Sequence, residues 1–133
     1  MTVPLWCLVV VLFIPQGIAV VGDVYRWRML GSIDNDDPRG QAGRLDGAGA
    51  RAYAAQSNAW EALPMFTVAV LLAHLTGADA GASATAAVLF VVARLLHAVF
   101  YITGLSSLRS LSFLAGVGCC IWLIVLAAGA PGA

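Results

Sequence analysis

The sequence contains no lysine, and charged side chains of any kind are scarce. Of its 133 residues only 11% are charged and 61% are hydrophobic, and the arginines and acidic residues balance to a formal net charge of zero. Soluble domains carry about a quarter charged residues. The composition therefore argues against a soluble globular protein. The balanced charge also gives no indication of a nucleic-acid partner.

The few charges leave long stretches of the chain uncharged. Residues 3–22, 62–78 and 110–133 carry no charge, and residues 80–108 contain only Arg94. A helix needs about 20 apolar residues to cross a hydrocarbon core roughly 30 Å thick. The pattern predicts an all-α integral membrane protein, a single domain over residues 1–133. Its four transmembrane helices are expected at approximately 3–27, 50–76, 83–104 and 108–130.

The connections between these helices predict the topology. Residues 31–49 are rich in Asp, Asn, Gly and Pro, which is typical of a loop without a periodic apolar face. The two later connections are short, so neighbouring helices must run antiparallel in an up-down bundle. All arginines outside the spans fall on the side of the first and third connections. By the positive-inside rule this side is cytoplasmic and both termini are not. We expect a bacterial-type inner membrane.

Polar residues nevertheless occur inside two of the predicted spans. On the second helix Arg51 and Asn58 lie about 20° apart around the axis, and Glu61 lies about 60° beyond Asn58. On the third helix Arg94 shares one face with two further polar residues, His97 and Tyr101. The rise per residue places these polar groups of the two helices at matching depths, roughly 18–28 Å from the non-cytoplasmic edge. The groups are Asn58 and Glu61 on the second helix and Arg94, His97 and Tyr101 on the third. Polar groups at such depth usually face a bundle interior or a water-filled cavity.

Two interpretations of these residues stay open from the sequence alone. In the structural one, Glu61 and Arg94 form a buried ion pair, and Asn58, His97 and Tyr101 make interhelical hydrogen bonds. In the functional one, the same residues line a polar pocket, open to the cytoplasm, that holds a zwitterionic or anionic small molecule. The arginines around the expected mouth favour the pocket.

The other reactive side chains indicate no site. The cysteines Cys7, Cys119 and Cys120 all lie inside predicted spans, where we interpret them as small packing residues. No metal-ligand spacing is present, so no metal is expected. His74 stands alone near the outer end of the second helix and is interpreted as an interfacial or core histidine.

Two motifs together resemble those of a known family. The run RAYAAQSNAWEALPMF (51–66) precedes an apolar stretch, and RLLHAVFY (94–101) is followed by LRS (108–110). This combination resembles the MAPEG family, membrane-associated proteins in eicosanoid and glutathione metabolism, over nearly the whole chain. The resemblance implies a homotrimer with glutathione-binding sites between neighbouring subunits near the cytoplasmic face.

The resemblance also implies roles for individual residues. In such proteins the position of Arg109 stabilises the glutathione thiolate, and that of Ser110 is implicated in the prostaglandin-isomerising branch. Arg51 matches a family arginine with a more structural role. With Arg94 added from the polar pocket, the expected glutathione-binding set is Arg26, Arg51, Gln56, Asn58, Glu61, Arg94, His97 and Tyr101.

The chemistry implied by the resemblance is consistent with the residues. A thiol with a pKa near 8.5 is mostly protonated at neutral pH, and a fixed cation favours the nucleophilic thiolate. Arg109 is always protonated and opens the fourth helix, whose dipole adds the same sign of charge. We therefore expect a glutathione S-transferase-like transferase or peroxidase, with glutathione as co-substrate, acting on lipophilic electrophiles that arrive through the membrane.

Some positions depart from the family pattern. Relatives that bind glutathione well carry a second arginine where this chain has Ala54, and an aromatic residue where it has Ala62. The segment between Tyr101 and Arg109 is also one residue longer than in leukotriene-forming relatives. These departures keep two alternatives open: a non-catalytic membrane protein that binds glutathione or a lipid-derived ligand, and a structural trimer scaffold.

Overall fold

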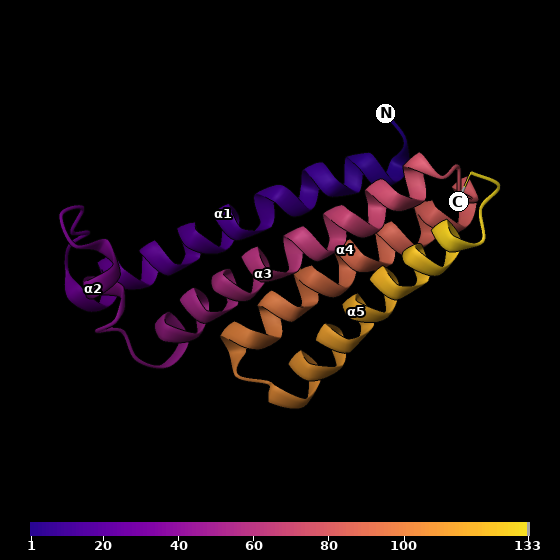
Figure 1. Ribbon diagram of the computed structural model, residues 1–133. Helices are drawn as coiled ribbons and strands as arrows, with labels where there is room; N and C mark the ends of the chain where they lie inside the picture. Colours follow the sequence, from indigo (N-terminus) through magenta and orange to yellow (C-terminus); the bar gives the residue numbers. More distant parts are fainter. Residues whose placement is uncertain (133) are drawn as a thin grey trace.

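The computed structural model describes residues 1–132 and is all-helical over that range, with four long helices (Figure 1). This confirms the predicted fold class. The first of these helices ends at Leu30, later than expected, and the other three begin at Gly47, Ala80 and Ser106, two or three residues earlier than expected. The elements are α1 (Val3–Leu30), α2 (Pro38–Ala42), α3 (Gly47–Leu75), α4 (Ala80–Thr103) and α5 (Ser106–Ala128).

Local capping signals explain where the long helices begin and end. Helix α1 ends at Gly31, which adopts a left-handed φ of 76° and donates its N–H to the Trp27 carbonyl. Gly104 ends α4 in the same way, at a φ of 81°. A left-handed residue at this position is nearly always glycine, because it has no Cβ to clash. At the start of α4 the Asp79 carboxylate accepts from the Ala82 N–H at 2.7 Å, which begins that helix at Ala80.

The sequence predicts a loop over the whole first connection, but part of this connection is helical. It contains the five-residue helix α2. Asp37 caps this helix by accepting from the Gly40 N–H at 3.0 Å, and Pro38 occupies the first helical turn, where its missing N–H has no consequence. A helix this short has no apolar period that a sequence pattern could reveal.

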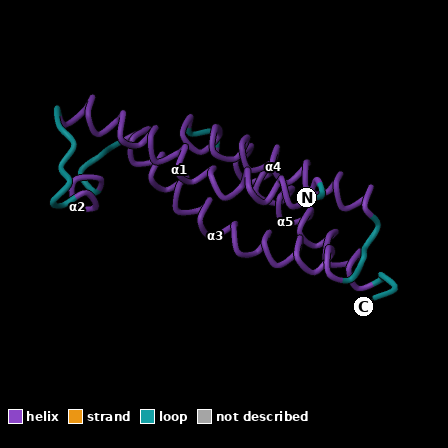
Figure 2. Tube along the Cα trace, turned by 90° about the horizontal axis from the view of Figure 1, so that it is seen from above, coloured by secondary structure: helices purple, strands orange, loops and turns teal. Residues whose placement is uncertain are grey.

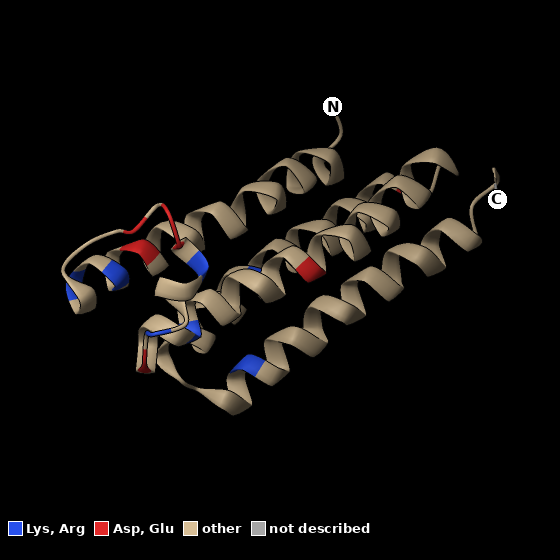
Figure 3. Cartoon of the chain, turned by 60° about the vertical axis from the view of Figure 1, so that its left-hand side comes forward, with Lys and Arg blue, Asp and Glu red and all other residues tan. Residues whose placement is uncertain are grey.

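The four long helices run side by side and alternate in direction (Figures 1 and 2). Helices α3 and α4 each contact the other three, whereas α1 and α5 do not contact each other within residues 1–132. One end of the bundle carries α2 and the α4–α5 connection, and most charged residues gather there (Figure 3). We call it the arginine-rich end. The other, the terminal end, carries the start of α1, the α3–α4 turn and the end of α5.

The core of the bundle is built from small residues. The buried face of α3 repeats at alternating intervals of three and four residues, the spacing of left-handed helix packing. Small side chains at such positions let helix backbones approach closely in lipid. The Phe66 and Phe90 rings stack with centroids 4.0 Å apart and join α3 to α4. The repeating positions on α3 are Ala52, Ala55, Ala59, Ala62, Phe66, Ala69 and Ala73.

The outer surface is as apolar as the core. Large hydrophobic side chains such as Phe13, Val68, Leu95 and Leu114 are exposed along the whole length of the bundle. A helix that is hydrophobic all round belongs in a membrane or a large core. All four long helices are long and apolar enough to cross a bilayer. The protein is therefore an integral membrane protein.

Candidate functional site

The central polar cluster joins α3 and α4 in the arginine-rich half of the bundle. Arg94 is only 4% exposed, and its Nη2 donates to Asn58 Oδ1 at 2.6 Å and to the Asn58 carbonyl at 3.3 Å. The Asn58 amide nitrogen lies 3.4 Å from Glu61 Oε2 and donates to it. Asn58 thus stands between Arg94 and Glu61.

The ion pair between Glu61 and Arg94, which belongs to the structural interpretation, is not formed. Within residues 1–132 the only ion pair joins Arg26 and Asp23. Glu61 is exposed at the surface of α3, and its short polar neighbour Asn58 takes the position facing Arg94. The structural interpretation was therefore wrong about the pair, although it was correct that Asn58 makes an interhelical hydrogen bond.

A cavity of about 220 Å³ opens beside this cluster between α3, α4 and α5. Its polar groups come from Asn58, Glu61 and Arg94. The Arg94 groups Nε and Nη1 have no protein acceptor among the described residues, so part of this guanidinium is available to a ligand. The remaining wall is apolar and consists of Ala62, Met65, Phe90, Phe113, Gly116 and Val117.

A second cavity, of about 370 Å³, shares Asn58 and Phe113 with the first. The Arg109 guanidinium carbon lies 4.6 Å from the centre of the Tyr101 ring, a cation–π contact that orients the cation. Arg109 stands in the first turns of α5, where the helix dipole is positive. The sequence predicted that these residues share a site, and the structure brings five of them together: Asn58, His97, Tyr101, Arg109 and Ser110.

His97 is the most buried member of this second cavity. It is 3% exposed, and its ring meets the Tyr101 ring edge-on with centroids 5.5 Å apart. Its Nδ1 has no hydrogen-bond partner in the described chain. Buried polar atoms are rarely left unpaired, so this nitrogen is an uncommitted polar group inside the site.

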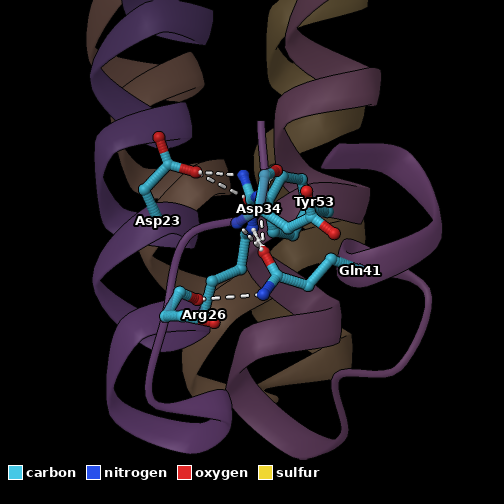
Figure 4. A network of polar contacts seen from close by, with 6 residues as sticks. Asp23, Arg26, Asp34, Gln41 and Tyr53 are labelled. Carbon is cyan, nitrogen blue, oxygen red and sulfur yellow. Dashed lines mark hydrogen bonds and ion pairs between the residues drawn. The ribbon is translucent and has the colours of Figure 1, made fainter. Parts of the chain in front are cut away.

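A separate polar network surrounds Arg26 at the end of α1 (Figure 4). The Arg26 Nε and Nη2 both donate to Gln41 Oε1, at 2.8 and 2.6 Å. Nη2 also donates to the Asp34 carbonyl at 2.7 Å, and Nη1 to Asp23 Oδ1 at 2.9 Å. The Tyr53 hydroxyl donates to the same Asp23 oxygen at 2.9 Å. We call Asp23, Arg26, Asp34, Gln41 and Tyr53 the Arg26 clamp.

The Arg26 clamp fixes the first connection against the bundle. Gln41 is buried, accepts the Asp34 N–H at 2.9 Å and donates to the Ser32 carbonyl at 2.9 Å. The Asp34 carboxylate accepts backbone N–H groups from Asp37 and Asp36, at 3.2 and 2.8 Å. These backbone hydrogen bonds hold the pKa of the Asp34 carboxyl below its usual value. The clamp thus ties α1 to α2 through Arg26 and Gln41, and to α3 through the hydrogen bond from Tyr53 to Asp23.

The remaining predicted residues lie apart from the two cavities. Arg26 and Gln56 line a third, open cavity of about 540 Å³ on the face formed by α1, α2 and α3. Arg51 donates from Nε to the Ile102 carbonyl at 2.9 Å and so braces the end of α4. Within one chain the predicted site residues therefore lie in three places. Most line the two cavities between α3, α4 and α5, Arg26 and Gln56 line the cavity of α1, α2 and α3, and Arg51 contacts the end of α4.

Sequence reasoning missed several residues that shape these places. Gln41 gave no signal, because it lies in a segment expected to be a loop. Asp23 and Tyr53 were not singled out by any sequence pattern either. Phe113, the shared wall of the first two cavities, looks in the sequence like any apolar residue of a membrane span. No group of three His, Cys, Asp or Glu side chains in residues 1–132 is placed to hold a metal ion.

Comparison with known proteins identifies the family. Searches against curated proteins and against solved structures gave no match. The profile of the MAPEG family matches residues 3–129, almost the whole chain. Members of this family are membrane proteins of glutathione and eicosanoid metabolism. The four membrane-spanning helices agree with the profile match, and this chain belongs to the MAPEG family.

Proposed function

We propose that this protein is a membrane-bound, glutathione-dependent transferase or peroxidase that acts on lipophilic electrophiles. The observation that carries the proposal is the pair of neighbouring cavities that share Asn58 and Phe113. One contains Arg109 held against Tyr101, and the other contains Arg94 with donors to spare. Membership of a family associated with glutathione supports the choice of thiol.

The charges in the two neighbouring cavities complement those of glutathione. This tripeptide carries two carboxylates, one ammonium group and a thiol. The unpaired N–H groups of Arg94 suit a carboxylate, because charge-assisted hydrogen bonds to guanidinium are the strongest available to it. Glu61 suits the ammonium group, since its carboxylate has only the weak Asn58 contact. Arg109 is then the cation for the sulfur.

The proposed chemistry uses Arg109 to stabilise the thiolate. The thiol loses its proton to water through the open cavity, and the guanidinium favours the resulting anion. In conjugation the sulfur forms a bond to the electrophilic carbon while the leaving group departs with the bonding electrons. In peroxide reduction the sulfur attacks one peroxide oxygen and releases an alcohol. A second glutathione then displaces water from the oxidised sulfur and yields the disulfide.

We also propose that the working unit is a homotrimer with shared sites. The cavity with Arg26 and Gln56 lies on the α1–α3 face, whereas the Arg109 cavity lies between α3, α4 and α5. In a cyclic assembly each copy presents one face to the opposite face of its neighbour. Such an interface would bring Arg26 and Gln56 of one copy next to the Arg109 cavity of its neighbour. In the proposed orientation both halves lie towards the cytoplasm, in a bacterial-type inner membrane.

A second candidate is a non-catalytic protein that binds glutathione or a lipid-derived ligand. The observation that favours it is Ala54, where relatives that bind glutathione well carry a second arginine. Without that arginine one charge-assisted contact is missing. Such a protein would still bind the tripeptide but would show no conjugation.

Conjugation measured with the Arg109→Ala variant tests the proposal. Glutathione and a chlorodinitrobenzene electrophile are supplied to the purified protein, and the formation of conjugate is followed by absorbance. We expect the rate of Arg109→Ala to fall about a hundredfold, the effect of removing one preorganised group that stabilises charge. The matched control Arg28→Ala removes an exposed arginine at the same end and should keep the wild-type rate. Conjugation by Arg109→Ala at the wild-type rate would refute the role of Arg109. A wild-type rate no higher than the uncatalysed background would leave the binding-protein alternative.

A further inference from the structure

A cavity at the terminal end of the bundle takes no part in the site described above. It has a volume of about 280 Å³ and lies where the start of α1, the end of α3 and the start of α4 meet (Figure 1). Its walls are mainly apolar, with only three polar side chains. The lining side chains near its centre include Pro4, Val70, Ala73, Ala78 and Ala84, and the polar ones are Thr2, His74 and Ser83.

Ser83 is the first sign that a ligand belongs in this cavity. Its side chain is only 5% exposed, and its Oγ has no hydrogen-bond partner among residues 1–132. Serine in a helix can bond to the carbonyl one turn earlier, but the Asp79 carbonyl accepts only the Ser83 backbone N–H. A hydroxyl can both donate and accept by rotating about its bonds. A bound polar group would therefore satisfy an atom that the protein leaves unpaired.

The start of α1 is the second sign. Thr2 has the extended backbone of a capping residue, yet its side chain makes no capping hydrogen bond, and no acidic residue stands in the first turn. The first N–H groups of a helix point out of its end and favour a negative charge. The start of α4 differs, because Asp79 already caps it. Pro4 in this turn has no N–H, so α1 presents the Val3 N–H at the edge of the same cavity that Ser83 lines.

These features select the chemistry of the occupant. A cation does not fit, because no carboxylate lines the cavity. A small inorganic anion would leave the apolar walls unfilled. An alkyl chain alone would leave the buried Ser83 hydroxyl unpaired, which is unfavourable for a buried polar group. The volume corresponds to roughly nine heavy atoms at the space of one water each.

We propose that this cavity binds a short amphiphile with a carboxylate head, of the size of a medium-chain fatty acid. The carboxylate accepts from the Ser83 hydroxyl, from the Val3 N–H at the start of α1 and from the His74 imidazole N–H. The chain fills the apolar wall around Val70 and Ala73. The site lies at the opposite end of the bundle from Arg109, and this inference does not depend on the proposed function.

Melting temperatures of the protein in lipid nanodiscs, measured with increasing octanoate, test the proposal. A ligand that binds only the folded state raises the melting temperature in a saturable way. Octanol, with the same chain but no carboxylate, and acetate, with the carboxylate but no chain, should give no saturable rise. Ser83→Ala should require about tenfold more octanoate for half of the maximal shift. Ser107→Ala, a matched change on an exposed serine at the other end, should behave as wild type.

The outcomes separate this site from the glutathione site. Glu61→Gln should keep the octanoate shift, and Ser83→Ala should keep whatever response to glutathione the wild type shows. Ser83→Thr, which retains the hydroxyl, should bind octanoate better than Ser83→Ala and so distinguishes a lost hydrogen bond from a general loss of stability. Equal shifts with octanol and octanoate, or an unchanged titration for Ser83→Ala, would overturn the proposal.

Discussion

Arg26 and Arg94 are buried to the same extent, at 5% and 4% exposure, but their surroundings differ completely. Arg26 donates from Nε, Nη1 and Nη2 in four hydrogen bonds to three acceptors within the Arg26 clamp. Arg94 uses only Nη2, on Asn58. Each guanidinium requires compensation for its removal from water. Arg26 receives it from the protein, and Arg94 receives it only in part.

The difference indicates which arginine is structural and which can bind a ligand. A saturated guanidinium can contact a ligand only by giving up an existing hydrogen bond. An unsaturated one beside a cavity gains by accepting a ligand. The glutathione contact implied for Arg26 by family resemblance therefore requires the Arg26 clamp to rearrange, whereas Arg94 needs no rearrangement.

The largest expected effect is the loss of stability in Arg26→Met. This change leaves Gln41 Oε1 and the Asp34 carbonyl without their buried donor, and we expect unfolding to become easier by about 3 kcal/mol. Thermal unfolding of the purified protein measures it. The matched control Arg28→Met, on the same turn but exposed, should change stability by less than about 0.5 kcal/mol. Equal effects of the two changes would show that the clamp does not hold the connection.

Arg94→Met should weaken glutathione binding more than it lowers stability, the reverse of what we expect for Arg26→Met. Only the hydrogen bonds to Asn58 are lost, and a buried charge is removed with them, so we expect a stability loss of about 1 kcal/mol. Glutathione binding should weaken more than tenfold, because charged hydrogen bonds to the ligand disappear. Calorimetric titration with glutathione measures the affinity. If stability falls as far as in Arg26→Met while affinity is unchanged, Arg94 is a structural residue.

Ala54→Arg should strengthen glutathione binding by adding a charged hydrogen-bond donor beside Asn58. Ala54 precedes Asn58 by one helical turn, and residues at this spacing lie on the same face. The new guanidinium adds one charge-assisted contact, and we expect about tenfold tighter glutathione binding. Ala54→Gln, of similar length but uncharged, is the control and should gain little. An equal gain from both variants would attribute the effect to side-chain length rather than charge.

The smallest expected effect is the contribution of Asp34, a member of the Arg26 clamp, to the pH dependence of stability. Backbone hydrogen bonds lower the pKa of Asp34 in the folded protein, so its stabilising contribution is fully present above the unfolded pKa near 3.8. It is lost as the pH falls through that value towards the lower folded pKa. Unfolding curves measured from pH 6 downward should therefore show a smaller acid-induced loss for Asp34→Asn than for wild type. Parallel pH profiles would contradict this assignment.

The sequence predicted the fold because the governing signals are long and simple. Uncharged runs of about 20 residues define membrane spans regardless of their partners. Asn58, Arg94 and Tyr101 could likewise be placed near one another from depth and helical phase alone. Both arguments need only the geometry of a single helix.

The sequence could not predict which polar groups pair. Whether Asn58 or Glu61 faces Arg94 depends on side-chain length and on how α3 is rotated against α4. Gln41 acts across 15 residues on Arg26, a distance that no local pattern encodes. The empty space beside Ser83 likewise follows from where three helix ends meet. These features belong to packing between elements rather than to any one of them.

The central claim is that the cluster of Asn58, Glu61, Arg94 and Arg109 binds glutathione and does not merely hold the helices together. Thermal unfolding of purified wild type, Glu61→Gln and Arg109→Ala over a range of glutathione concentrations tests it most directly. The account predicts a saturable rise in the wild-type melting temperature and a weaker response in Glu61→Gln, which removes one charge with almost no change in shape. No wild-type shift at millimolar glutathione, with both variants merely less stable, would contradict it.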